Sequence, residues 1–392
     1  MSRKTRAFDA WIRRRFVHLN TELETIYARQ PDRLSVDAVG TELKTELVAE
    51  GREHIAALLA EGNTGEGLAD GFDLLGNVGL YMAACRRHGI TDPERERRSP
   101  LVEASALALH AAASLGVAPR FIASHLATHN RAIDGVCKSF TSLNDEFVFL
   151  EHNTRAILLH RQAADALGRI PPLGISHPVA HDLLTAAARA LEDVVASNDA
   201  LFGKLDADRF FYSIRPYYKP VQVGLHVYRG ANAGDFAGVS EIDLMLGLCS
   251  ANDPSYSQQL VDKSHFMTLE DQARLRNCMR RGSLLDEILG QLDSSERQPW
   301  FRKNVRAFLD VCDKYAAAAT QHHDRLVARF IDRPAAELPD ADRKNLTASG
   351  PPLPVLLAGL EKLRDMRRAA PRQDIPSRHD DIRRLRTAVG HR

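Results

Sequence analysis

Histidine offers the most chemistry in this chain, which has 16 histidines among 392 residues against 8 tyrosines and 2 tryptophans. Neutral imidazole is the commonest metal ligand and carries protons near neutral pH. His125 and His129 are four residues apart, so on a helix both would lie on one face and could bind a metal ion. No glutamate follows His125 as in HExxH, and no third ligand is near in sequence. His177 and His181 share this spacing, but Pro178 between them indicates an ordinary helix start.

His322 and His323 lie in a different context. Four alanines, residues 316–319, precede them in a segment with helical apolar spacing, so this helix is thin just before the histidines. A thin helix lets a flat group approach closely, and a histidine one turn further along could coordinate it. The pattern also fits a close contact between two helices with a hydrogen-bonded histidine. The residue types alone leave both interpretations open.

A second candidate site combines aromatic rings with a cation. Residues 209–219 read RFFYSIRPYYK, so five aromatic side chains surround Arg215 in sequence. Aromatic rings pack against planar molecules, and an arginine can bind a carboxylate through two parallel hydrogen bonds. The alternative is the end of a core helix whose arginine reaches toward solvent. The nearby segment 229–238 lacks the features of a phosphate loop, so it does not predict nucleotide binding.

The elements that position these residues are predicted to be helices almost throughout, because apolar residues recur at helical spacing. The expected helices cover about residues 6–29, 40–61, 73–88, 99–116, 118–131, 144–168, 178–202, 268–292, 299–331 and 353–368. Only residues 221–228 alternate like a strand. The predicted fold is all-α, with a looser N-terminal helical region at 1–70, one large helical domain at 71–365 and a basic tail at 366–392.

Composition restricts the partners. The 52 Lys and Arg nearly balance the 51 Asp and Glu, which gives no global electrostatic case for nucleic-acid or membrane binding. The five cysteines lack CxxC spacing, which argues against covalent haem, structural zinc and disulfides and suits a reducing cytoplasm. No apolar run reaches the ~18 residues of a membrane span, and the N-terminus does not resemble a secretory signal. We expect a cytoplasmic protein, and a homo-oligomer is left open.

Four segments occur in an order that resembles the indoleamine and tryptophan dioxygenase superfamily of haem proteins. They are FFYSIRPYYKP (210–220), FAGVSEIDLMLGLC (236–249), HDRLVARFI (323–331) and TASGPPLPVL (347–356). The local similarity is closest to the monodechloroaminopyrrolnitrin synthase (PrnB-like) branch. The segments LLGNVGLYMAACRRHG (74–89) and LATHN (126–130) also resemble that branch. The resemblance covers roughly residues 70–365 and depends on the order and spacing of the motifs.

This resemblance implies that His323 is the proximal ligand of haem b. In the superfamily that histidine is followed by a helix ending in a basic residue, an aromatic residue and isoleucine, as residues 329–331 do here. His322 is the alternative register, and on a helix it would point about 100° away. Relatives tend to carry an arginine three residues before the ligand, paired with a haem propionate. Thr320 takes that place here, so another basic residue would have to replace it.

The remaining site residues are also implied by the resemblance. Phe210 and Arg215 match the family positions that line the distal pocket and bind a substrate carboxylate, and Thr347, Ser349 and Gly350 match the loop that closes over haem and substrate. Phe149 and Phe211 are the other phenylalanines that could line the pocket with Phe210. Arg215 would bind the substrate carboxylate, and the phenylalanines would form an apolar wall against a planar ring. His152 falls near a distal polar position, where it could move protons as a second catalytic residue beside Arg215.

The implied activity is a haem b-dependent oxidation of an aromatic amino acid or indole derivative, with O2 or peroxide as co-substrate. Dioxygenation, hydroxylation and ring rearrangement all fit the residues, and the context implied is secondary metabolism. The alternative is a non-catalytic helical protein that binds or senses haem. Arg215 and its aromatic neighbours distinguish the two, because a haem carrier has no need to bind a substrate carboxylate.

Overall fold

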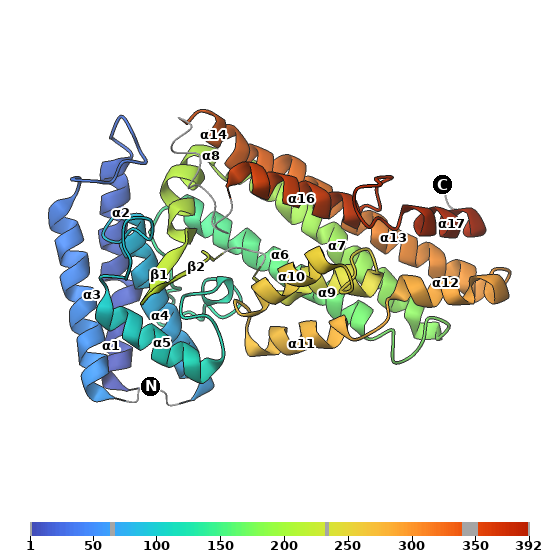
Figure 1. Cartoon of the computed structure of the whole chain (residues 1–392), viewed down its shortest axis with the longest axis horizontal. Coiled ribbons are helices and arrows are strands. Elements are labelled where there is room, and N and C mark those ends of the chain that lie inside the picture. Colours follow the sequence, from blue (N-terminus) through green and yellow to red (C-terminus); the bar gives the residue numbers. More distant parts are fainter. Residues whose placement is uncertain (1, 63–66, 232–234, 339–351, 391–392) are drawn as a thin grey trace.

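The structure, a computed structural model, is helical nearly throughout and confirms the predicted all-α class. The residues that it describes are 2–62, 67–231, 235–338 and 352–390. Within these ranges no helix combines the length and the apolar character needed to cross a lipid bilayer. Figure 1 shows two parts along the longest axis, a bundle of early helices at one end and a group of longer helices at the other.

The N-terminal bundle is formed by the first five helices, which lie on the left of Figure 1. They are α1 (Arg3–Arg13), α2 (Arg15–Tyr27), α3 (Thr41–Glu61), α4 (Leu68–Arg87) and α5 (Val102–Leu115). Their buried apolar side chains form one core, which a much later segment, residues 214–231, completes. That segment includes the antiparallel hairpin of β1 (Val221–Val223) and β2 (His226–Tyr228), where the sequence alternates like a strand.

The second part is built on three long helices, α6 (Asn144–Gly168), α7 (Pro178–Lys204) and α13 (Pro299–Gln321). Each presents a small or apolar face to a shared core, in which Leu184, Leu191 and Phe308 are fully buried. Shorter helices surround them: α8 (Ala207–Arg209), α9 (Ala237–Leu246), α10 (Pro254–Ser264), α11 (Leu269–Met279), α12 (Leu284–Ser295), α14 (Arg333–Ala336), α16 (Leu353–Arg367) and α17 (His379–Val389).

Several predicted helices differ in the structure: the helix expected over 6–29 is divided at Arg14 into α1 and α2, and α9, α10 and α17 lie where no helix was expected. Residues 118–131 form a loop with one short 3-10 turn, η1 (Ala123–His125), because this segment buries side chains in every direction instead of along one face. It also packs tightly on α4, where a Cβ on Gly79 would stand 2.1 Å from the backbone nitrogen of Phe121. The helix expected over 268–292 is divided into α11 and α12, and the Ser283 hydroxyl caps the second of these by accepting from the Asp286 amide at 3.1 Å.

The C-terminal residues are packed against the second part. Ile382, Leu385 and Val389 of α17 are buried in the core that α7 and α13 share. Arg306 of α13 donates to the Val389 carbonyl at 2.8 Å, which fixes the end of α17. The division into an N-terminal region, a central domain and a tail stays a prediction.

Gly230 fixes the segment that completes the N-terminal core, because a Cβ there would stand 1.7 Å from the Tyr218 carbonyl oxygen. We expect Gly230→Ala to lower the free energy of unfolding by about 3 kcal/mol, since the backbone itself must move to relieve the overlap. Gly290→Ala in α12 is the control, because nothing lies within 4 Å of its added Cβ. That change should raise stability by up to about 1 kcal/mol. Chemical denaturation measures both, and equal effects would contradict the packing described.

Candidate functional site

Four phenylalanines from separate elements meet beside the helix that follows α13, and we call this group the aromatic junction. Its members are Phe149 of α6, Phe202 of α7, Phe210 of the π-helical turn η2 (Phe210–Ile214), and Phe330 of the π-helix η4 (His322–Asp332). The ring centroids are 5.0 Å apart for Phe149 and Phe210, 5.9 Å for Phe210 and Phe330, and 6.2 Å for Phe202 and Phe330. The structure therefore brings two predicted wall residues, Phe149 and Phe210, against the helix that carries His323.

His323 lies in the first turn of η4, where the α-helical pattern of α13 changes to a π-helix, a form often found at functional sites. Its Nδ1 is 2.8 Å from Asp324 Oδ1 and 3.2 Å from Arg364 Nη1, which also donates to Asp324 at 3.0 Å. A single nitrogen cannot donate to the carboxylate and accept from the guanidinium at once. The pattern that satisfies all three groups has both Nδ1–H and Arg364 donating to Asp324. The lone pair of His323 then lies on Nε2, as a ligating histidine requires.

His322 faces a different environment. Enclosure by protein is the largest cause that lowers the pKa of its imidazole to about 4, followed by the charges of Arg367, His160 and neighbouring His323 and Lys263. The side chain is nevertheless exposed to solvent, so the positive charges around it support the lowered pKa better than burial does. His160 of α6 behaves alike, since burial lowers its pKa to about 4 while its Nδ1 contacts the Ala156 carbonyl at 2.7 Å. Both rings are therefore neutral at pH 7.

Arg215, at the start of the 3-10 turn η3 (Arg215–Tyr218), is one of four buried arginines among the described residues. The other three have carboxylate partners: Arg13 with Asp9 at 2.7 Å, Arg87 with Glu24 at 2.7 Å, and Arg120 with Asp235 at 3.0 Å. Arg215 is 7% exposed and makes no hydrogen bond or ion pair to any described residue. This burial lowers the pKa of its guanidinium to about 10. Among the described residues it therefore has no counter-ion.

The surroundings of Arg215 are aromatic and cationic. Its guanidinium carbon lies 5.5 Å from the centroid of the Phe211 ring, so the predicted residues Phe211 and Arg215 are in contact. Phe211 itself belongs to a small cluster with Ala335 and Leu353, apart from the aromatic junction. Lys219 follows one turn later, and burial together with the charges of Arg86 and Arg215 lowers the pKa of its ammonium to about 7. An anion would be favoured in such surroundings.

His152 is buried between α6 and α7, one turn along α6 from Phe149. Its Nδ1 lies 3.3 Å from the Ser197 hydroxyl, and its Nε2 is buried with no hydrogen-bond partner among the described residues. Burial is the first cause that lowers the pKa of this imidazole, and the charge of Lys204 adds to it. A neutral ring with one unused nitrogen can accept or donate a proton there. No hydrogen bond joins His152 to Arg215 within the described part of the chain.

The thin face of α13 and Thr320 do not join the side chains described above. Thr347, Ser349 and Gly350 fall outside the described residues. The thin face of α13 opens on an outer groove of about 600 Å³, which Ala316, Ala317, Thr320, Asp324, Arg325 and Arg368 help to line. Thr320 therefore faces this groove, on the side of α13 toward Val195 and Asp199 of α7.

The metal-site alternative finds no support in the described residues. His125 lies in η1 and uses both ring nitrogens, since Nδ1 accepts from the Ile122 amide at 2.9 Å and Nε2 lies 3.0 Å from the Phe72 carbonyl. Its ring stacks on Phe72 at a centroid distance of 3.9 Å. No group of three or more His, Cys, Asp or Glu side chains suited to a metal ion occurs in the described ranges. His125 is thus a satisfied core histidine.

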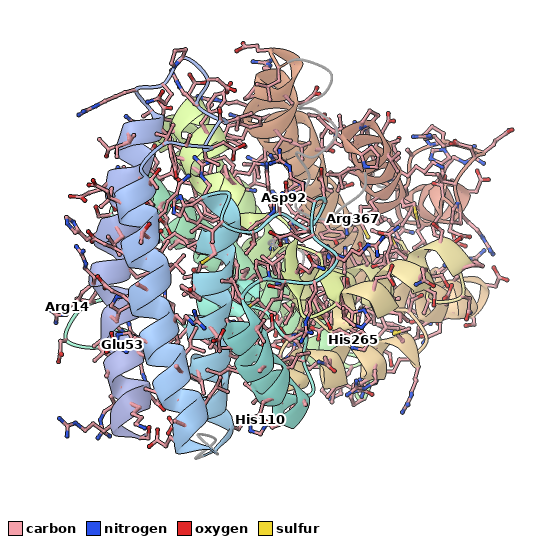
Figure 2. All side chains as sticks on the ribbon, turned by 60° about the vertical axis from the view of Figure 1, so that its left-hand side comes forward. Arg14, Glu53, Asp92, His110, His265 and Arg367 are labelled. Carbon is pink, nitrogen blue, oxygen red and sulfur yellow. The ribbon has the colours of Figure 1, made fainter. Side chains whose placement is uncertain are left out.

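Sequence reasoning missed a buried charge network beside His160 and His322. Asp243 of α9 is fully buried and accepts from the hydroxyls of Tyr256 and Tyr315, each at 2.7 Å, and from Arg367 of α16 at 2.8 Å. Figure 2 places Arg367 and His265 away from Glu53 and Arg14, which lie on the N-terminal bundle. An aspartate inside the otherwise apolar run of residues 242–249 was the signal available in the sequence.

The chain matches one family among known proteins. The sequence model of a family described as monodechloroaminopyrrolnitrin synthase PrnB matches residues 2–389. The match extends over nearly the whole chain, including the first 70 residues, where the motifs gave no resemblance. A search of curated proteins found no match.

Proposed function

Because this chain belongs to the monodechloroaminopyrrolnitrin synthase PrnB family, we propose that it oxidises an aromatic amino acid or indole derivative with haem b as cofactor. The family is one of haem-dependent oxygenases that act on a tryptophan-derived substrate, so the chain is an enzyme, an oxidoreductase. The observation that carries the proposal for this chain is Arg215, a buried cation in contact with an aromatic ring and with no counter-ion in the described part of the chain. The non-catalytic alternative gives such a residue no role.

His323 is the residue that would hold the haem. Its Nδ1 has an acceptor in Asp324 at 2.8 Å, and Arg364 holds that carboxylate at 3.0 Å, so the ring is oriented and Nε2 keeps its lone pair. A hydrogen bond of this kind makes a ligating imidazole more basic and fixes its tautomer. When bound, haem would supply the iron centre at which O2 or peroxide is activated.

The substrate would be held at both of its ends. Arg215 would bind its carboxylate through paired hydrogen bonds, which supply a counter-ion that no described residue provides. Phe149 and Phe210 would pack against its planar ring, and Phe211 would keep the Arg215 guanidinium in place by stacking. The loop with Thr347, Ser349 and Gly350 would close over the substrate, as the resemblance implies.

His152 would manage a proton at Nε2. The lowered pKa keeps its imidazole neutral at pH 7, so Nε2 can take a proton from a reacting group and return it later in the cycle. The Ser197 hydroxyl, 3.3 Å from Nδ1, stabilises the ring orientation that points Nε2 away from α7. Such a proton-transfer role does not depend on which ring oxidation the enzyme performs.

The test is an absorption spectrum of the protein expressed with haem supplementation. A Soret band is expected, and its absence after reconstitution with haem would overturn the proposed function. Tryptophan and tyrosine derivatives are then added one at a time, and those that bind should shift the band. Esters of the same compounds, which lack the carboxylate, should shift it only at much higher concentration. If the acid and the ester shift the Soret band at the same concentration, the protein does not recognise the carboxylate.

A further inference from the structure

The turn that leads to Arg215 is held by a side chain of the N-terminal bundle. Arg87, the last residue of α4, donates from Nη2 to the carbonyl oxygen of Tyr212 at 3.0 Å. Tyr212 lies in the π-helical turn η2, directly before η3, which begins with Arg215. In an α-helix the Tyr212 carbonyl would accept from the amide four residues later, but that residue is Pro216, which has no N–H. Arg87 therefore supplies a donor where proline has removed one.

The guanidinium of Arg87 is fixed independently of Tyr212. Its Nε and Nη2 donate to the two oxygens of Glu24 in α2, at 2.7 and 2.8 Å. Both side chains are buried, and the Tyr27 ring covers the guanidinium, with 4.9 Å between the guanidinium carbon and the ring centroid. Two parallel hydrogen bonds to a carboxylate fix the plane of an arginine. The remaining N–H of Nη2 thus reaches Tyr212 from a rigid support.

A second contact anchors the same segment two residues beyond Arg215. The Tyr217 ring is buried, stacks on Phe140 at a centroid distance of 4.4 Å and meets the His88 ring nearly at right angles at 5.7 Å. His88 caps the end of α4, and its Nε2 lies 2.8 Å from Asn20 Oδ1 of α2. The backbone on both sides of Arg215 therefore rests on α2 and α4.

We propose that Arg87 is a positioning residue for substrate recognition, which holds the turn from Tyr212 to Arg215 so that the Arg215 guanidinium meets the substrate carboxylate. No described residue forms a hydrogen bond or ion pair with that guanidinium, so its place depends on the backbone of the turn and on its contact with Phe211. Tyr212 supports both, since its ring packs against Phe211 at 5.0 Å. A shift of the turn by about 1 Å would misalign the paired hydrogen bonds to a carboxylate. The inference rests on the proposed function, because it takes Arg215 to be the residue that binds the carboxylate.

The experiment uses haem-loaded protein and two ligands, the tryptophan or tyrosine derivative that binds the wild type and the methyl ester of that compound. The variant changes Arg87→Met and Glu24→Gln together, so that no carboxylate stays buried without its partner. It should bind the acid about 10-fold more weakly, the equivalent of about 1.4 kcal/mol, with little change for the ester or for haem. The Soret shift measures both affinities. A purely structural defect would weaken the binding of haem, acid and ester alike.

The matched control is Arg13→Met with Asp9→Asn, which removes a second buried pair of the same bundle. Arg13 pairs with Asp9 at 2.7 Å and also donates to a carbonyl, that of Val136 at 2.6 Å, outside the segment of Arg215. This variant should lose a comparable amount of stability in a thermal melt and keep the wild-type ratio of acid to ester affinity. An unchanged ratio in the Arg87 variant, or an equal fall in both variants, would overturn the inference while the proposed function stands. If the wild type binds no haem, or binds acid and ester equally, the proposed role of Arg215 fails and this inference fails with it.

Pro216→Ala tests the route through the Tyr212 carbonyl. Alanine restores an amide N–H that can donate to this carbonyl, so its addition to the double variant should recover part of the lost ratio. Hydrogen exchange of the haem-free proteins gives a reading that needs no ligand. Amides of residues 210–218 should exchange faster in the Arg87 variant, regain protection with Pro216→Ala, and keep wild-type protection in the control. Unchanged exchange in this segment would show that Arg87 does not hold the turn.

Arg87→Lys takes the place of the double variant if that protein does not fold. Lysine keeps a positive charge beside Glu24 but lacks the planar fork that reaches the carboxylate and the Tyr212 carbonyl together. The acid-to-ester ratio and the protection of residues 210–218 should both fall, by less than in the double variant. Wild-type values for both would contradict the proposed role of Arg87.

Discussion

Arg215→Met is expected to stabilise the ligand-free protein and to weaken substrate binding about 10- to 100-fold. The wild-type guanidinium is buried with no counter-ion among the residues that the structure describes, and its pKa of about 10 reflects the cost of that burial. Because the folded-state pKa is below the unfolded value, the folding penalty is fully present at pH 7 and falls only as the pH rises through about 10. Methionine removes the charge, so the free energy of unfolding should rise by about 1–3 kcal/mol. The lost paired hydrogen bonds account for the weaker binding.

Two measurements separate these effects, namely chemical denaturation of the ligand-free protein and the substrate-induced Soret shift. Arg209→Met is the matched control from the same segment, because Arg209 is 61% exposed and pairs with Asp145 at 2.6 Å. Because the Asp145 carboxylate is 4% exposed, the loss of its partner should lower the free energy of unfolding by about 1–3 kcal/mol, opposite in sign to the effect of Arg215→Met, and leave substrate affinity unchanged. A loss of several kcal/mol in Arg215→Met would mean that the folded protein already provides an anionic partner for Arg215.

His323→Ala is expected to abolish the Soret band, whereas His322→Ala should leave most of it in place. Of these two histidines, His323 is the one whose Nδ1 has a carboxylate acceptor among the described residues, which leaves its Nε2 available as a ligand. Imidazole added to His323→Ala should restore the band, because the small molecule can occupy the space left by the side chain. Haem titration with absorbance and a pyridine haemochrome assay measure the occupancy.

Asp324→Asn provides a graded control for the same ligand. The amide retains an oxygen acceptor but loses the charge that makes the imidazole more basic, so haem affinity should fall about 10-fold while the band persists. The reverse result, with His322→Ala losing haem and His323→Ala retaining it, would move the ligand by one residue. The neutral ring of His322 would then have to be the coordinating group.

The regular part of the fold was predictable from the sequence. Strong periodicity predicted a helix at 144–168, and α6 has these bounds, while α3, α7 and α16 begin and end within about two residues of expectation. The prediction of a helix at 118–131 was wrong, because periodicity cannot distinguish a helix with one apolar face from a loop that is buried on all sides. His125 illustrates the difference, since its ring bonds to the Ile122 amide within a tight turn.

The site was predictable only in its residue types. The sequence marked Arg215 as a cation among aromatic residues, but its lack of a counter-ion depends on which carboxylates the fold brings near it. Glu24, which neutralises Arg87, lies 63 residues away in sequence. Roles for His152 and His323 stay predictions.

The late completion of the N-terminal core has a consequence for biosynthesis. Helices α1 to α5 end at Leu115, yet Ile214, Tyr217, Val223 and Ala231 belong to the same core. More than half of the chain must leave the ribosome before that core can close, so the first five helices wait with apolar faces exposed. Nascent chains in this condition associate readily with chaperones or with one another. During synthesis, the first five helices therefore cannot complete their core until residues 214–231 have been translated.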